Sequence, residues 1–442
     1  MQDKSYVPFT KEMIKDYTVL VPNMLPMHFK LISSVLKTHG YTLKVLENSG
    51  PQIAETGLKY THNDTCYPAI LMIGQFMDAL LSGEYDTRKT ALIMFQTGGG
   101  CRASNYISLI RKALKKAGME YVPVISLSFA GLEKHSGFKL DLKKMKQLVY
   151  AVLYGDLLMN LVNQVRPFET EKGSAERLAD EWVRRLGEEL GASKRISYKK
   201  VRGKYREIIK SFMEIPIENR KAVKVGIVGE IFVKYSPLGN NDLERFIINE
   251  GGQSVVPGLC DFAMYCVYDM IAEHEIYKNS HLKYRLTKFV YNYLNKKRTH
   301  ISEALVESGR FDGLTPFDRV VHLADGLIST AVQMGEGWLL TAEMVELAES
   351  GCNNIVCTQP FGCLPNHICG KGMMKPIKEL FPDVNIVAID YDAGASRVNQ
   401  ENRLKLMLAN AKKISARNSS VADAAEKEAQ QKNDTAYCNA EK

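Results

Sequence analysis

The chain has 442 residues, of which 45% are hydrophobic and 24% are charged, and these proportions are close to the averages of globular proteins. They exclude collagen-like and wholly disordered chains, and the length predicts two or three domains with a sizeable core. The 58 Lys and Arg residues exceed the 50 Asp and Glu residues by only eight. Because no basic stripe is interleaved with aromatic residues, we expect no binding to nucleic acid.

The most apolar long stretch, residues 147–165, is interrupted by Gly155 and Asp156. It falls short of the about 18 uninterrupted apolar residues that a membrane-spanning helix usually needs, so we expect no membrane helix. The N-terminus lacks the basic and apolar segments of a secretory signal. The sequence therefore favours a cytoplasmic protein whose cysteines are reduced.

Strands and helices alternate in the first third of the chain. Short apolar runs predict strands, and helical periodicity predicts helices between them. The predicted strands span residues 17–22, 42–46, 90–95 and 121–126, and the predicted helices end at residue 36 or span residues 68–81 and 105–117. This alternation is typical of a parallel sheet covered on both faces. We expect a first α/β domain at residues 1–137 and a helical connector at residues 138–220.

The alternation resumes near residue 222. Strands are predicted at residues 222–229, 254–257, 354–357 and 385–389, and helices at residues 241–249, 341–349, 367–380 and 396–409. Residues 261–334 have a mainly helical pattern, so the second α/β domain, residues 221–411, is expected to carry a helical insertion. Residues 412–442 have few large apolar side chains and are expected to form a disordered tail. The predicted fold class is α/β, with two parallel-sheet domains of Rossmann-like or flavodoxin-like topology.

Nine cysteines are the most informative residues of the chain. Their spacing matches neither zinc ribbons nor bacterial ferredoxins. In open parallel sheets, ligands bind beyond the carboxyl ends of the strands, where helix N-termini also point. Four cysteines are predicted at such positions: Cys66, Cys101, Cys357 and Cys363. Helix N-termini are expected to lower the pKa of these thiols.

Each predicted α/β domain contributes two of the four cysteines, so they either form one metal site across a cleft or are four unrelated buried thiols. Thiolates without histidine favour an iron-sulfur cluster or zinc. Cys369 is a further candidate ligand, and the other cysteines are expected to be buried thiols or to lie outside the site: Cys260, Cys266, Cys352 and Cys438.

Three loops near the same edge are candidates for substrate contact, although each could also be a simple turn. They contain the glycines Gly98, Gly99 and Gly100, and the carboxylates Glu230 and Glu336. The chain has no G-x-x-x-x-G-K-[ST] motif and no G-x-G-x-x-G motif at these loops. We therefore expect no ATP or NAD site in this chain.

The cysteine loops lie in longer stretches with a distinctive sequence. These stretches are NDTCYPA (63–69), QTGGGCRASNY (96–106), YGDLL (154–158), GIVGEI (226–231), GEGW (335–338), CTQPFGCLPNH (357–367) and IDYDAGAS (389–396). In them the chain resembles the activase-related proteins of the 2-hydroxyacyl-CoA dehydratase and benzoyl-CoA reductase superfamily, in particular the region that follows the activase domains in large fused forms. The resemblance extends over about residues 6–408.

The resemblance implies an oxygen-sensitive iron-sulfur cluster, of the 4Fe-4S type, held between two α/β domains. The family's cysteines correspond to Cys66, Cys101, Cys357 and Cys363. The resemblance also implies a separate ATP-dependent activase that reduces the cluster, because this chain has no activase domain. The substrate would be an acyl-CoA or another small molecule that is hard to reduce. A related branch carries a double-cubane cluster, which would require six cysteines, Cys260 and Cys369 among them.

Two classes of function remain open at this point. The chain is either a dehydratase-type or reductase-type enzyme component or a non-catalytic partner of the activase that carries a cluster and transfers electrons. Four thiolates would fill the iron sites of a cubane and favour electron transfer, whereas three would leave one iron open and favour catalysis. Either form is compatible with a homodimer or a heterodimer.

Overall fold

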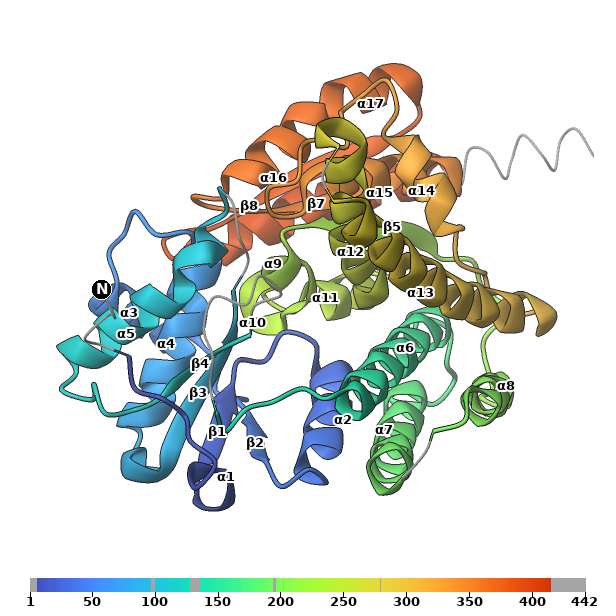
Figure 1. The fold of residues 1–442 in the computed structure, drawn as a ribbon. Helices are drawn as coiled ribbons and strands as arrows, with labels where there is room; N and C mark the ends of the chain where they lie inside the picture. Colours follow the sequence, from blue (N-terminus) through green and yellow to red (C-terminus); the bar gives the residue numbers. More distant parts are fainter. Residues whose placement is uncertain (1–5, 97–99, 128–135, 194–195, 279, 415–442) are drawn as a thin grey trace, which may run out of the picture.

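The computed structural model describes residues 6–96, 100–127, 136–193, 196–278 and 280–414. It contains two four-stranded parallel sheets with helices around them (Figure 1). The predicted α/β fold class with two parallel-sheet domains is therefore confirmed.

The first sheet has the strand order β2-β1-β3-β4. Its strands are β1 (Thr18–Val21), β2 (Thr42–Val45), β3 (Thr90–Phe95) and β4 (Val124–Leu127). The helices of this domain are α1 (Met13–Asp16), α2 (Pro26–Lys37), α3 (Pro51–Tyr60), α4 (Tyr67–Leu81) and α5 (Tyr106–Lys116), with short 3-10 turns at Thr87–Lys89 and Arg102–Asn105. Strand β3 is buried along nearly its whole length, as expected for an inner strand of a parallel sheet.

The second sheet repeats this arrangement in the order β6-β5-β7-β8. Its strands are β5 (Val223–Gly229), β6 (Gly252–Val255), β7 (Asn354–Pro360) and β8 (Asn385–Tyr391). The accompanying helices are α9 (Ile231–Tyr235), α10 (Pro237–Asn240), α11 (Leu243–Asn249), α15 (Gly337–Glu349), α16 (Leu364–Cys369) and α17 (Met374–Leu380). In each sheet the strand order reverses between the first and third strands, which is where ligands of open α/β sheets bind.

Six further helices form a third layer beside the two sheets (Figure 1). They are α6 (Leu142–Val165), α7 (Ser174–Ala192), α8 (Tyr198–Met213), α12 (Leu259–Tyr277), α13 (His281–Glu307) and α14 (Phe317–Leu323), and they share one hydrophobic core. Among the described residues, α6 is the one helix long and apolar enough to cross a membrane, but 72% of its apolar window is buried inside the protein. It is the core helix of this layer.

Several predicted boundaries differ from the structure, and three of the differences affect the site or the C-terminal segment. Strand β7 continues to Pro360 rather than ending at residue 357, because it pairs with β8 up to Tyr391. The predicted helix 367–380 is divided into α16 and α17 by Gly370 and a 3-10 turn at Lys371–Met373. The last helix spans residues 397–414 and so enters the segment predicted as a tail. Residues 415–442, with Cys438, lie outside the described residues.

A buried aspartate links the first domain, the connector and the insertion. Asp156 of α6 accepts hydrogen bonds from the Nε2 of His28 and from the backbone N–H groups of Leu259 and Cys260, each over 2.8 Å. Because both N–H groups lie at the start of α12, the carboxylate satisfies donors that the helix itself leaves unpaired. The position of α12 is therefore fixed relative to α2.

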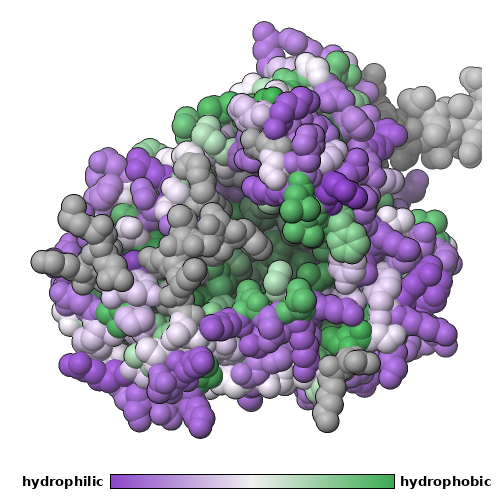
Figure 2. Space-filling model, in the orientation of Figure 1, coloured by the Kyte–Doolittle hydropathy of each residue, from purple (hydrophilic) through white to green (hydrophobic). Residues whose placement is uncertain are grey.

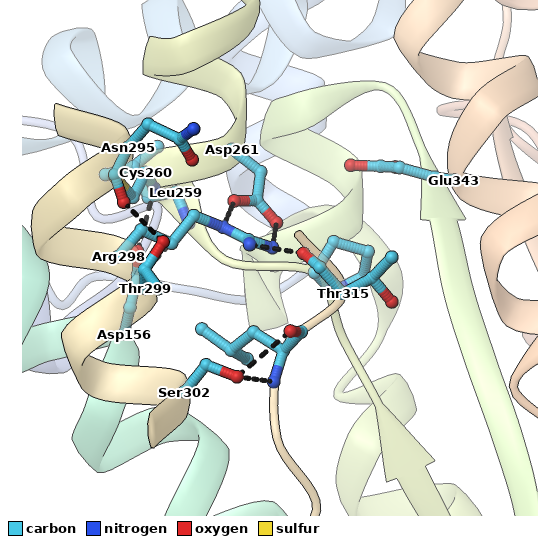
Figure 3. Close-up of polar contacts among 12 residues, drawn as sticks. Asp156, Leu259, Cys260, Asp261, Asn295, Arg298, Thr299, Ser302, Thr315 and Glu343 are labelled. Atoms are coloured by element: carbon cyan, nitrogen blue, oxygen red, sulfur yellow. Dashed lines mark hydrogen bonds and ion pairs between the residues drawn. The ribbon is translucent and has the colours of Figure 1, made fainter. Parts of the chain in front are cut away.

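In the same first turn of α12, a buried ion pair joins this helix to α13 (Figure 3). The Nη2 of Arg298 donates to the Oδ2 of Asp261 over 3.0 Å, and the Nε of Arg298 donates to the other carboxylate oxygen. The Nη1 of Arg298 donates to the carbonyl oxygen of Thr315. Arg298 and Asp261 are 3% and 6% exposed, so the two charges depend on each other and on Thr315 rather than on water.

Candidate functional site between the two domains

The loop that follows β7 packs directly against the start of α4 in the other domain. The backbone N–H of Tyr67 donates to the carbonyl oxygen of Phe361 over 3.0 Å. Gly362 has a φ of 73°, and a Cβ atom on it would lie only 3.1 Å from the Cα of Cys66. Both the positive φ and this close approach favour glycine. The contact brings Cys66, the N-cap of α4, beside Cys363, the N-cap of α16.

Cys101 lies at the same place. It is the N-cap of the 3-10 turn that follows β3. A Cβ atom on Gly335 would lie 3.9 Å from the Sγ of Cys101 and 3.1 Å from the Cβ of Pro365, in the first turn of α16. The structure therefore gathers three of the four predicted cysteines, Cys66 and Cys101 from the first domain and Cys363 from the second.

Figure 2 shows a hollow with apolar walls at the centre of one face of the molecule, between the two domains. Two of the three cysteines follow strands that flank the topological switch points of the two sheets: Cys101 follows β3 and Cys363 follows β7, and Glu230 follows β5. Cys66 lies between α3 and α4 and reaches the same place through the contact with the loop after β7. The rule that ligands bind at these points thus predicts one shared site for both domains.

Two buried carboxyl groups accompany the thiols. Glu230 is the N-cap of α9, and its Oε2 accepts a hydrogen bond from the N–H of Val233 over 2.9 Å. The Oε1 of Glu336 accepts from the N–H of Ile231 at the same helix end over 2.8 Å. Burial, followed by repulsion from Glu336, raises the pKa of Glu230 to about 8. Burial also raises the pKa of Glu336.

The thiols do not have the lowered pKa values predicted from helix N-termini. Burial, followed by repulsion from nearby Glu336 and Glu230, raises the pKa of Cys101 to about 11. Burial likewise raises the pKa of Cys66 and of Cys363. Desolvation therefore outweighs the helix N-termini and, at Cys66, the nearby Arg102, so the charge of a buried thiolate beside carboxylates is incompletely compensated. A bound metal cation would supply that compensation and displace the thiol protons.

The fourth predicted ligand, Cys357, is placed differently. It lies inside β7, three residues before the end of the strand, and is fully buried. A Cβ atom on Gly370 would lie 3.0 Å from its Sγ. Cys357 thus faces the C-terminal end of α16, whereas Cys363 caps the N-terminal end, and the six residues of α16 span about 9 Å. Cys357 packs with Cys352 and Cys369 in the core of the second domain.

The remaining candidate residues are two cysteines of α12 and the glycines that follow β3. Cys260 and Cys266 belong to α12 and pack in the core of the helical layer. Gly98 and Gly99 lie outside the described residues. Gly100 is described, and a Cβ atom on it would lie 2.4 Å from the Sδ of Met334, so Gly100 packs closely on the loop that carries Glu336.

The donor set suits a metal centre rich in sulfur. No group of three or more His, Cys, Asp or Glu side chains in the described part of the chain is already arranged around a metal position. The side chain of Gln359, two residues from Cys357 and on the same face of β7, is 1% exposed, and neither its Oε1 nor its Nε2 has a hydrogen-bond partner among the described residues. A buried amide without a partner is costly, and this one lies next to the carboxyl end of β7. The three gathered thiols are therefore compatible with a metal group bound at this edge, whereas Gln359 lies on the face of β7 that also carries Cys357.

No family model matches the chain, and no curated protein matches it. The family resemblance therefore stays a prediction that rests on the motifs.

The carboxyl pair predicts how the stability of the metal-free chain changes with pH. With a folded-state pKa of about 8, Glu230 keeps its proton in the folded chain up to about pH 8. In the unfolded chain the same group loses its proton near pH 4.5. The unfolded state then binds fewer protons between about pH 4.5 and 8, so the free energy of unfolding falls as pH rises, by up to about 1.4 kcal/mol per pH unit for one proton. Denaturant titrations at several pH values measure this slope. Glu230→Gln should flatten it, whereas the exposed Glu214→Gln should not, and equal slopes in all three proteins would contradict the prediction.

Proposed function

We propose that this chain holds a 4Fe-4S cluster through Cys66, Cys101 and Cys363, and that a separate ATP-dependent activase reduces the cluster. The observation that carries the proposal is the meeting of these three thiols from two domains, two of them after the strands that flank the switch points of the sheets. Thiolates are soft ligands, so a site with three of them favours an iron-sulfur cluster over a hard cation. Zinc is the alternative metal, and iron and acid-labile sulfide content distinguishes the two.

We further propose that the chain is an enzyme component acting on an acyl-CoA or another small molecule that is hard to reduce. The separation of Cys357 from the other three thiols supports this choice over electron transfer, because three protein ligands would leave one iron of a cubane without a thiolate. When bound, the cluster would supply a low-potential electron and an open iron. The chain's own contribution would be the two carboxyl groups at the start of α9.

Glu230 would hold a proton near neutral pH, since burial and Glu336 raise its pKa to about 8. A protonated carboxyl group beside the site suits general acid catalysis, for example protonation of a leaving hydroxyl group. Glu336 would keep Glu230 in that state through the repulsion between the two groups. Both side chains are oriented by backbone N–H groups of α9, so their positions are defined before a substrate binds.

Spectroscopy of the reduced protein tests the proposal. The chain is prepared without oxygen, reconstituted with iron and sulfide, reduced and examined by electron paramagnetic resonance with and without acyl-CoA compounds. We expect about four iron atoms per chain and a signal that changes when an acyl-CoA binds. The electron-transfer alternative would be favoured if a partner activase reduced the cluster but no acyl-CoA changed the signal of the reduced cluster. A colourless protein without iron or sulfide would contradict the cluster itself.

A further inference from the structure

Helices α6, α8 and α13 meet around one buried lysine (Figure 1). Lys297 of α13 is only 5% exposed. Its Nζ lies 3.6 Å from the ring centre of Tyr198 in α8, 3.8 Å from that of Tyr293 in α13 and 5.9 Å from that of Tyr150 in α6. We call these three side chains the tyrosine cage. Since Tyr198 and Tyr293 are half-buried, the cage lies close to the surface.

The amine of Lys297 has no hydrogen-bond acceptor and no carboxylate partner within the described part of the chain. The cage hydroxyls have other neighbours: that of Tyr198 lies 2.7 Å from the Nδ1 of His300, and those of Tyr150 and Tyr293 lie 3.4 Å from each other. Aromatic ring faces attract a cation, but they carry no net charge. The cage therefore leaves the positive charge of Lys297 without a counter-charge.

Two further lysines add positive charge at the same place. The Nζ of Lys146 in α6 lies 5.9 Å from the ring centre of Tyr150, and Lys296 precedes Lys297 in α13. Both are exposed, and neither forms an ion pair with another described residue. Lys146 donates one hydrogen bond, to the carbonyl oxygen of Ile196 over 3.1 Å, which leaves two of its donors free. Burial, followed by repulsion from Lys146 and Lys296, lowers the pKa of Lys297 to about 8, so at neutral pH all three lysines are mostly charged.

Glu303 of α13 does not compensate this charge, because it pairs with Arg202 of α8 over 3.2 Å. Buried charges in proteins are normally paired with charges of opposite sign. A buried, unpaired cation beside two more lysines therefore favours the binding of an anion. A phosphate group suits this place, because it carries up to two negative charges and its oxygen atoms accept charge-assisted hydrogen bonds from several amines at once.

We propose that Lys297, Lys146 and Lys296 bind the phosphate group of a small molecule at the rim of the tyrosine cage. The ligand would be a phosphate ion or a phosphate monoester. The buried Lys297 would define the position of the phosphate group, and the exposed Lys146 and Lys296 would add charge at the entrance. The proposal is independent of the cluster and of the proposed function.

Thermal unfolding of the metal-free full chain at pH 7 tests this. Inorganic phosphate and glycerol 3-phosphate are each titrated, with sodium chloride of equal ionic strength as the reference. We expect a saturable rise in the melting temperature of the unmodified chain, because a ligand that binds only the folded state stabilises it. Lys297→Met should lose this rise. Lys283→Met is the matched control, since Lys283 is an exposed lysine at the start of α13, and it should keep the rise.

A second variant tests the proposal through exposed side chains alone, so that it remains decisive if Lys297→Met does not fold. In calorimetric titrations with inorganic phosphate and glycerol 3-phosphate, Lys146→Met with Lys296→Met should weaken binding at least about tenfold, since two charged donors are lost. A response to both compounds would indicate a site for phosphate itself, and a response to glycerol 3-phosphate alone a site for a monoester. Equal binding by the unmodified chain and this double variant would overturn the proposal. So would binding to phosphatidic acid vesicles without a response to either soluble compound.

Discussion

Cys363→Ala should remove most of the iron from the anaerobically reconstituted protein. Cys363 is the only one of the three gathered thiols that the second domain supplies. Its loss would leave Cys66 and Cys101 in the first domain, and two thiolates hold a cubane cluster poorly compared with three. Cys101→Ala should have a similar effect. Iron and acid-labile sulfide per chain are the measurements, together with the visible absorption of the cluster.

The matched controls are two other buried cysteines of the same domain. Cys352→Ala and Cys357→Ala also remove a buried thiol, but neither thiol lies in the three-cysteine group. We expect nearly unchanged iron content in both. Loss of iron in Cys357→Ala equal to that in Cys363→Ala would mean that four cysteines bind the cluster, as the family resemblance implies, and would favour electron transfer.

Arg298→Met should lower the free energy of unfolding by about 3–5 kcal/mol, because it leaves the buried carboxylate of Asp261 without its counter-charge. It also leaves the carbonyl oxygen of Thr315 without the guanidinium donor. Urea denaturation of the metal-free chain under reducing conditions measures the change. Since Asp261 lies in the first turn of α12, we expect the docking of α12 on α6 to weaken as well.

Arg206→Met is the matched control, because the pair of Arg206 with Glu307 is half exposed and should contribute about 1 kcal/mol or less. Adding Asp261→Leu to Arg298→Met should recover much of the lost stability by removing the uncompensated charge. An equal loss of unfolding free energy in Arg298→Met and Arg206→Met would contradict the prediction, because it would show that burial of the Arg298–Asp261 pair does not increase the cost of breaking it.

The strands were the most predictable part of the fold. Strand β3 has the predicted bounds, residues 90–95, because a continuous apolar run ends there at a glycine-rich loop. Helix α3 was not predicted, since only Ile53 and Gly57 of its ten residues are buried and its apolar periodicity is short. The end of β7 was placed too early because proline is unusual in a strand, and Pro360 occupies the last position, where the strand ends.

The predicted end of this strand at residue 357 also determined which cysteines were expected in the site. A strand ending at residue 357 puts Cys357 at the ligand-binding edge, whereas the longer strand places it inside the core. Cys66, Cys101 and Cys363 could be selected from the sequence because each lies between a predicted strand or loop and a helix start. Glu230 and Glu336 could be named only as loop residues. Both carboxyl groups are buried at the start of α9 because α9 packs against the loop before α15. This contact joins residues that are distant in the sequence, so a local sequence pattern does not predict it.

The division of the three thiols between the domains limits when a metal can be inserted. Cys66 and Cys101 are made early in synthesis, but Cys363 emerges from the ribosome only after most of the second domain. A cluster bound by all three would therefore be assembled on the completed chain, after β7 has paired and the two domains have met. Once present, it would connect residues that are distant in sequence, so separation of the domains would require breaking an iron–sulfur bond. Chelation of the iron would then loosen the whole molecule rather than one loop.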